Sequence, residues 1–288
     1  MVREVLELLD VRPDGIYIDV TLGGGGHARA ILELLDRGRL LAIDQDPQAL
    51  KWARERLRGL DDKLILMEGN FSQIDALQEA SGLPRADGMV ADLGMSSLQL
   101  ADPARGFSFS QPGQLDMRFS PKIAITAEEM VNQSRERELA DLIFKLGEER
   151  HSRRIARAIV KARPIRTTTE LAQVVTRAIP SRAGLHQIHP ATRTFMALRL
   201  AVNRELESLE AFLGKVLEVL RPGGRVVVLS FHSLEDRLVK HTFRRWQYEG
   251  QARLVTRKAV RPSESEIAAN PRSRSAKLRA AEKSSPRG

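Results

Sequence analysis

Short apolar runs alternate with helical repeats along the first third of the chain. Apolar runs at 16–20, 40–44, 64–67 and 88–94 have the length of buried strands, and the segments between them carry apolar residues at helical spacing. A fifth apolar run, at 225–231, follows after a long interval. Strands that alternate with helices in this way predict a parallel sheet with right-handed crossovers, and therefore an α/β fold.

The alternation stops between the fourth and fifth apolar runs. Residues 95–122 are polar and rich in Pro and Gly, 126–180 have a helical pattern in which Gly147 could separate two helices, and 190–220 read as one long helix. We therefore expect an all-helical subdomain inserted into the sheet domain. The expected divisions are 1–105 and 197–262 for the two parts of the sheet domain, 106–196 for the insertion and 263–288 for a basic tail.

Positive charge is concentrated at the C-terminus. Residues 251–288 contain ten Lys or Arg against three Glu, whereas the preceding 250 residues contain 36 basic and 34 acidic side chains. Such a tail is typical of a protein that binds a polyanion, such as nucleic acid. The alternative is a solvated terminus kept for solubility. The stretches 253–256 and 275–279 predict a final antiparallel pair of strands, with disorder beyond about Ala281.

Composition narrows the class of protein. The chain has no Cys, which excludes disulfides, thiolate metal sites and a Cys nucleophile. No run of about 18 apolar residues predicts a membrane span, and the N-terminus lacks the layout of a signal peptide. No residues have the spacing of a tight metal site. We expect a soluble, cytoplasmic protein with no bound metal and no membrane partner.

Four glycines, Gly23 to Gly26, separate the first strand from the following helix. Glycines allow a positive φ and let a ligand approach the backbone, although a tight turn without a ligand is the alternative. A dinucleotide site would place a third glycine where Ala28 and Arg29 stand. A methyltransferase that uses S-adenosyl-L-methionine needs only a looser turn, because it binds no pyrophosphate. The sequence therefore favours the methyltransferase.

Side chains after the next two strands agree with that cofactor. Asp44 follows the second strand, where a carboxylate can accept both ribose hydroxyls, and Asp46 is the better candidate for the cap of the next helix. Phe71 follows the third strand and could pack on adenine or in the core. His27 could cap the glycine turn or contact the cofactor.

At this level of detail the sequence resembles the bacterial MraW or RsmH family of methyltransferases, which modify N4 of a cytidine in small-subunit ribosomal RNA. The matching segments cover nearly the whole chain, in order. They are 12–19, 25–27, 41–47, 92–97, 105–109, 115–118, 147–150, 189–195, 230–237 and 270–275.

The resemblance implies a methyltransferase domain interrupted by a helical domain, and a target cytidine in the decoding region of 16S ribosomal RNA. Family members usually begin with a segment that contains a His and a Pro-Val-Leu-Leu-like run, and this sequence begins instead at Met1-Val2-Arg3-Glu4-Val5-Leu6. Whether that segment contributes to the site therefore stays open. The implied cofactor contacts are Gly25, Gly26, His27, Asp44, Phe71, Asp92 and Gln99.

The amine of cytosine is a poor nucleophile, so an acceptor for its proton is expected. Many amino-methyltransferases place Asp/Asn/Ser-Pro-Pro-aromatic after the fourth strand, where this chain has Asp92 to Ser97 without Pro-Pro or an aromatic. The catalytic candidates are Asp92, Ser96 and His232. Ser96 could equally be a helix cap, and His232 a histidine satisfied at a strand end.

Basic residues of the insertion and the tail are the expected contacts to RNA phosphates. The target base must be unpaired, and Phe107, Phe109 or Phe231 could stack on it. Alternatives are a methyltransferase of this fold that acts on DNA, protein or a small molecule, and a non-catalytic RNA-binding protein. The oligomeric state, monomer or homodimer, stays open. The candidate RNA contacts are Arg150, Arg153, Arg154, Arg157, Arg193, Arg272 and Arg274.

Overall fold

The computed structural model describes residues 1–179 and 189–285, which form two compact units. The first, here called the sheet unit, contains Met1–Met95 and Leu206–Gly288, and the second, the helical unit, contains Ser96–Glu205. Pro180, where the sequence predicts the end of a helix, and the last residues of the tail, 286–288, lie outside the described residues.

One seven-stranded sheet organises the sheet unit, with the order β3-β2-β1-β4-β5-β7-β6. Strands β1 to β5 are parallel, and β7 pairs antiparallel with both β5 and β6. The predicted α/β class and the final antiparallel pair are confirmed. The strands are β1 Ile16–Asp19, β2 Arg39–Asp44, β3 Leu64–Glu68, β4 Ala86–Asp92, β5 Leu220–Ser230, β6 Ala252–Leu254 and β7 Lys277–Lys283.

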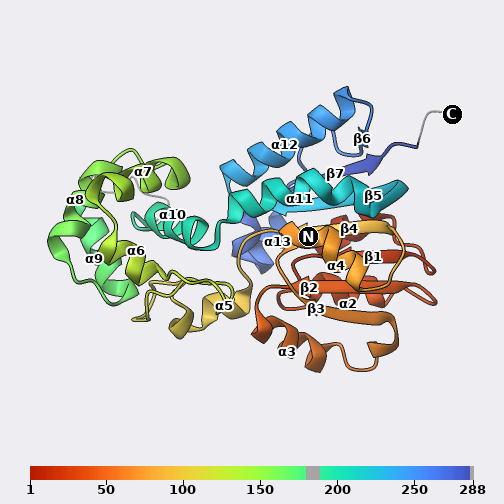
Figure 1. Ribbon diagram of the computed structural model, residues 1–288, viewed down its shortest axis with the longest axis horizontal. Helices are drawn as coiled ribbons and strands as arrows, with labels where there is room; N and C mark the ends of the chain where they lie inside the picture. The colour runs from red at the N-terminus through yellow and green to blue at the C-terminus, as the bar shows by residue number, and fades with distance from the viewer. Residues whose placement is uncertain (180–188, 286–288) are drawn as a thin grey trace. The chain divides into compact units, whose positions relative to one another are not determined.

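Apolar side chains cover both faces of the sheet, because successive strand residues point to opposite sides. Ile18 and Val226 pack with α4, α11 and α12, whereas Tyr17 and Val227 pack with α1, α2 and α3 (Figure 1). The sheet is therefore a buried layer between two layers of helices. These helices are α1 Val2–Leu9, α2 Gly26–Leu32, α3 Pro47–Arg56, α4 Ile74–Ala80, α11 Glu205–Val219 and α12 Ser233–Tyr248, and short turns are η1 Asp61–Lys63 and η2 Phe71–Gln73.

Helices dominate the helical unit, as the sequence predicts. The expected break near Gly147 is present, because Glu148 adopts a left-handed conformation between α7 and α8. A Cβ on Gly147 would lie 2.7 Å from the carbonyl oxygen of Arg193, so only glycine allows α7 and α10 to approach this closely. The elements are α5 Ser97–Ala101, η3 Pro103–Arg105, α6 Ala127–Gln133, α7 Glu136–Gly147, α8 Ser152–Ala162, α9 Thr168–Ala178 and α10 Thr192–Asn203.

The polar segment 95–122 is packed more tightly than its composition suggests. Phe107 and Phe119 are buried and their rings stack 5.3 Å apart. Asn203, at the end of α10, accepts a hydrogen bond from the backbone of Phe119 and donates one to the carbonyl of Met117. The segment therefore belongs to the core of the helical unit.

Two sequence predictions are wrong. The pattern at 190–220 is not one helix, because Arg204 adopts φ 49° and separates α10 from α11. Disorder does not begin at about Ala281, since β7 continues to Lys283 with Ala280 and Ala281 buried. Together with α13 Glu264–Ala269 and η4 Pro271–Ser275, this segment is part of the sheet unit. No helix among the described residues is long and apolar enough to cross a membrane.

Candidate functional site

Three acids lie at the carboxyl ends of neighbouring strands of the sheet unit. Asp19, Asp44 and Asp92 are the last residues of β1, β2 and β4. β1 lies between β2 and β4, so the direction in which the chain builds the sheet reverses here. Open α/β sheets bind their ligands in the crevice at such a reversal. The acids therefore mark the candidate site.

The glycine turn joins β1 to α2 at this edge. Gly23 and Gly25 have φ 49° and 76°, which a residue with a Cβ rarely adopts, and the Gly25 amide donates to the carbonyl of Leu22 at 2.7 Å. Gly26 has an ordinary φ, but a Cβ built on it would meet nothing within 4 Å. Gly26 therefore borders open space, as a glycine that allows close approach of a ligand should.

Asp44 fastens the glycine turn to the end of β2. One carboxylate oxygen accepts a hydrogen bond from the Gly23 amide at 2.8 Å, and the other accepts from the Asp46 amide at 2.9 Å. Burial raises the pKa of Asp44 to about 6, although these backbone hydrogen bonds oppose the rise. Each oxygen keeps a lone pair, so the carboxylate can also accept two adjacent hydroxyls. As predicted, Asp46 caps α3, accepting from the Gln48 amide.

Asp19 is a site residue that the sequence reasoning missed. It is 1% exposed and accepts a hydrogen bond from the Thr21 amide, while the Thr21 hydroxyl oxygen accepts one from the Asp92 amide at 2.6 Å. Burial raises the pKa of Asp19 to about 6, against the effect of nearby His27. Its position at the end of the first strand, before the glycines, is the signal that could have identified it.

His27 and Asp92 form a pair beside the turn. Nε2 of His27 lies 3.4 Å from Oδ2 of Asp92. Burial lowers the pKa of His27, but the hydrogen bond to Asp92 and the charges of Asp92 and Asp19 outweigh it, and the pKa is raised. Nδ1 of His27 and Oδ1 of Asp92 are buried and have no hydrogen-bond partner within the described part of the chain. Buried polar atoms are rarely left unpaired, so these two atoms fit a polar ligand.

Phe71 begins η2, directly after β3. Its ring packs edge-on against Phe212 of the core at 5.7 Å between centroids, and the side chain is half-buried. The preceding Asn70 donates to the side chain of Gln45 at 3.0 Å, which ties the end of β3 to that of β2. Phe71 thus packs partly against the core, and its contact with adenine stays a prediction.

Three other predicted residues have local structural roles. Ser96 and Gln99, in the helical unit, form the capping box of α5 through hydrogen bonds at 3.2 and 2.9 Å. His232 caps α12, its Nδ1 accepting from the Glu235 amide at 3.4 Å while Nε2 lies 3.0 Å from a Glu235 carboxylate oxygen. The catalytic roles of Ser96 and His232 and the cofactor contact of Gln99 stay predictions.

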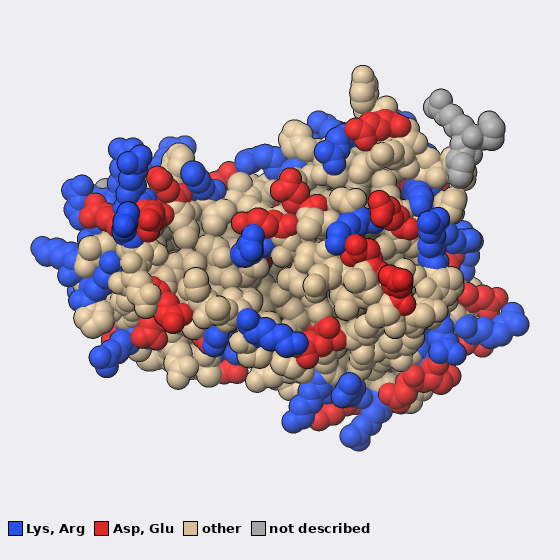
Figure 2. All heavy atoms as spheres, viewed as in Figure 1, with Lys and Arg blue, Asp and Glu red and all other residues tan. Residues whose placement is uncertain are grey.

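The predicted RNA contacts are exposed in both units. Figure 2 shows Lys and Arg atoms gathered where Figure 1 places α7 and α8. Arg157 lies 3.5 Å from Glu136, and Arg193 donates to the carbonyl of Glu148 at 3.2 Å. Arg150, Arg153 and Arg154 are exposed at the start of α8, whereas Arg272 and Arg274 lie in η4 of the sheet unit. The predicted set is therefore divided between the two units.

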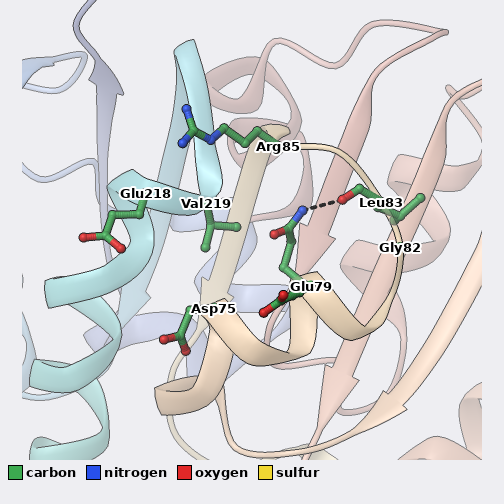
Figure 3. A pocket seen from close by; sticks show the side chains of 8 residues that line it. Asp75, Glu79, Gly82, Leu83, Arg85, Glu218 and Val219 are labelled. Carbon is green, nitrogen blue, oxygen red and sulfur yellow. Dashed lines mark hydrogen bonds between the residues drawn. The ribbon is translucent and has the colours of Figure 1, made fainter.

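A separate hollow of about 460 Å³ lies at the opposite edge of the sheet (Figure 3). Gly82, Leu83 and Arg85, which precede β4, line it together with Glu218 at the end of α11. It contains none of the acids at the carboxyl edge and is not the candidate site. Within residues 1–179 and 189–285, no group of three or more His, Asp or Glu side chains could hold a metal ion.

Comparison with known proteins identifies the family. The family model described as "MraW methylase family" matches residues 1–284. Proteins named ribosomal RNA small subunit methyltransferase H from Syntrophobacter fumaroxidans, Acidobacterium capsulatum and Cyanothece sp. are each 50% identical to the chain; the alignments cover 98% of the chain and 95%, 97% and 92% of those proteins. The resemblance is confirmed, as are the predictions of a methyltransferase and of S-adenosyl-L-methionine as its cofactor. The chain belongs to the MraW methylase family.

Proposed function

We propose that this methyltransferase transfers a methyl group to N4 of a cytidine in the decoding region of 16S ribosomal RNA, in the cytoplasm. Family membership supports methyl transfer. The name shared by the relatives, ribosomal RNA small subunit methyltransferase H, supports the small-subunit RNA as the target. The resemblance in the sequence motifs supports the cytidine amine as the acceptor.

The observation that carries the proposal is the acidic edge of the sheet unit, where Asp19 is buried and Asp44 and Asp92 are partly buried. Asp19, Asp44 and Asp92 surround a turn whose outer glycine faces open space. A cationic ligand gains from this charge, whereas a pyrophosphate would be repelled. S-adenosyl-L-methionine carries a sulfonium and an ammonium, so its charge fits this edge and that of a dinucleotide does not.

Each residue of the edge has a role in holding the cofactor. Asp44 would accept the two ribose hydroxyls, Gly25 and Gly26 would allow close approach of the methionine part, and the unpaired Nδ1 of His27 would bind one of its polar groups. When bound, the cofactor supplies an electrophilic methyl group on a sulfonium. Orientation of the amine in line with the leaving sulfur would then provide much of the rate acceleration.

Asp92 is the best of the three candidates for accepting the N4 proton. The Ser96 hydroxyl oxygen is used in capping α5, and Nδ1 of His232 accepts from the Glu235 amide, so the proton of its neutral ring is on Nε2, which can donate but not accept. Asp92 alone keeps a buried carboxylate oxygen without a partner in the described residues. A hydrogen bond from the amine to that oxygen favours attack by the nitrogen lone pair and gives the proton a place to go.

The helical unit would provide most of the RNA contacts. The exposed arginines of α8 are suited to phosphates, which position a strand without reading its sequence. The target cytidine must be unpaired, because pairing occupies its N4 amine. Arg272 and Arg274 would add contacts from the sheet unit.

Methyl transfer to small ribosomal subunits that lack the modification tests the proposal. The subunits are incubated with the protein and cofactor carrying a radioactive methyl group, the RNA is digested, and its nucleosides are separated. We expect the label in N4-methylcytidine, and no label with Asp44→Ala protein. Label in another nucleoside, or in ribosomal protein, would contradict the proposal.

A further inference from the structure

The helical unit contains a groove that the proposed chemistry does not use. It measures about 340 Å³, near the lower end of the range for small-molecule sites. The loop that precedes Ser110, one face of α9 and the segment before α10 form its walls. The lining residues are Phe109, Thr169, Ala172, Gln173, Thr176, Arg177 and His189.

Two aromatic rings form one wall. The ring of Phe109 lies 4.7 Å from that of His189 and, on another side, 4.7 Å from that of Phe195, which is buried. Phe195 thus supports the ring of Phe109 from within. Phe109 is only half-buried and His189 is exposed, so both rings remain accessible from the groove.

Three lining side chains offer hydrogen-bonding groups to a ligand beside the two rings. Nδ1 of His189 accepts a hydrogen bond from the Ala191 amide at 3.2 Å, so the proton of the neutral ring is on Nε2, which can donate to a ligand. The Thr176 hydroxyl donates to the Ala172 carbonyl at 2.7 Å and keeps acceptor capacity. The Gln173 side chain is exposed and offers both a donor and an acceptor.

One cation completes the groove. Arg177 is exposed in the last turn of α9 and lines the groove beside the aromatic wall. No carboxylate is among the described lining residues, so the groove is suited to an anionic ligand. An aromatic wall, neutral hydrogen-bonding groups and one guanidinium match the base and phosphate of a single nucleotide.

We propose that this groove binds one unpaired nucleotide of the RNA substrate, its base against Phe109 and His189 and its phosphate on Arg177. The inference rests on the proposed function, since it takes RNA to be the substrate. The described lining residues include no carboxylate that could accept a proton from a cytosine amine, so the proposed role of the groove is to hold RNA and not to transfer the methyl group. Stacking is tolerant of sequence, so the four bases should bind with similar affinity.

Binding of a fluorescein-labelled single-stranded RNA of twelve nucleotides and mixed sequence, followed by anisotropy at several salt concentrations, tests the inference. Phe109→Leu keeps apolar bulk but removes the ring, and we expect about tenfold weaker binding with an unchanged salt slope. Phe109→Tyr keeps the ring and should bind like the wild type. Arg177→Ala should lower the slope of log affinity against log salt by about 0.7, the value for one phosphate contact on a single strand.

Two further variants test whether the effects of Phe109→Leu and Arg177→Ala arise from misfolding or from a general loss of positive charge. Gln173→Ala changes an exposed helix position, so the fold should persist while binding weakens about threefold, roughly one neutral hydrogen bond. Arg137→Ala removes an exposed charge from α7, outside the groove, and should change binding less than Arg177→Ala.

Wild-type binding by Phe109→Leu and Arg177→Ala, or equal effects of Arg137→Ala and Arg177→Ala, would overturn the inference. So would a loss of affinity confined to assembled small subunits and absent with the oligonucleotide, which would indicate a docking site for a ribosomal protein. Failure of methyl transfer to small subunits, with normal effects of the groove variants, would instead contradict only the proposed target.

Discussion

The acidic edge of the sheet unit and the outer face of α8 in the helical unit are opposite in charge and in the way the charge is held. Asp19, Asp44 and Asp92 lie at strand ends, and backbone amides fix the carboxylates of the first two. Arg153 and Arg154 are exposed on a helix surface in solvent. The buried acids are preorganised for a small ligand of fixed shape, whereas solvated arginines suit a long polyanion whose contacts can shift.

This difference explains why the net charge of +9 alone says little about the cofactor. Positive charge spread over a surface attracts RNA through a field that salt screens within about 10 Å at 0.1 M. Charges buried at the strand ends are screened much less. The same chain can therefore bind a cation at one place and a polyanion at another, and salt should affect the two very differently.

Asp44→Ala should have the largest effect on the sheet unit. It removes the acceptor for the Gly23 amide and, in the proposed function, the acceptors for two ribose hydroxyls. Hydrogen bonds to a charged group contribute about 1.5–3 kcal/mol each, so we expect about 10²- to 10⁴-fold weaker cofactor binding by calorimetry, with RNA affinity unchanged. Asp75→Ala is the matched control, because Asp75 is a surface acid paired with Lys215 on the same unit. Unchanged cofactor affinity in Asp44→Ala would show that the acidic edge is not the cofactor site.

Replacing Arg153, Arg154 and Arg157 by Ala should weaken RNA binding through α8. Three lost phosphate contacts predict about 10- to 100-fold weaker RNA binding at 0.1 M salt and a salt slope smaller by about 2. Cofactor affinity should not change. The control replaces Lys51, Arg54 and Arg58, exposed residues of the sheet unit, and removes the same charge. If both triple variants lose RNA affinity equally, net charge rather than α8 governs binding.

The sequence was informative where local chemistry decides the structure. Asp46 before Pro47 predicts a helix cap, and the short apolar runs predict the strands, because capping and the length of an apolar run depend on neighbours along the chain. It was misleading at Arg204, whose left-handed conformation breaks an unbroken helical pattern. Propensity strongly disfavours that conformation for Arg, so only the tertiary structure could reveal the break.

The sequence was also misleading in the C-terminal segment. Its basic composition predicts a tail, yet Ala280 and Ala281 are buried in β7, and Lys277 and Arg279 pair with Asp236 of α12 at 2.9 and 2.7 Å. Part of a basic cluster can thus serve the fold, which no count of charges reveals. Removing 251–288 would delete two strands of the sheet, so Arg272→Ala with Arg274→Ala is the proper test of this segment in RNA binding.

Adding a methyl group at Gly26 can test whether the cofactor occupies the space beside it at the acidic edge. Gly26 and Gly214 are both helical glycines at which an added Cβ meets nothing within 4 Å. Gly26→Ala should fold normally but bind the cofactor about tenfold more weakly, because the methyl group enters the space left for the ligand. Gly214→Ala, inside α11, should leave cofactor binding unchanged and stabilise the protein by about 0.5–1 kcal/mol. Equal cofactor affinities in the two variants would mean that the space beside Gly26 is not occupied by the cofactor.

Lowering the pH should produce the smallest of these effects. It should weaken cofactor binding at the acidic edge without weakening RNA binding through α8. Burial raises the pKa of Asp44 to about 6, so this carboxylate takes up a proton as the pH falls through that value and loses acceptor capacity. Between pH 7.5 and 5.5 its ionised fraction falls about fourfold, and cofactor affinity should fall by up to that factor, while Asp44→Asn protein should show a weaker dependence on pH.

Protonation of Asp19 and Asp44 does not itself unfold the protein. The pKa values of Asp19 and Asp44 lie above the ordinary 3.8, so between about pH 6 and 4 the folded state binds more protons than the unfolded state, and these two groups stabilise the fold as the pH falls. Their contribution is lost again as the pH rises through about 6. Weaker cofactor binding at pH 5.5 with an undiminished unfolding midpoint would therefore report the titration of the acidic edge itself. Arginines keep their charge throughout, so RNA binding through α8 should not weaken over the same range.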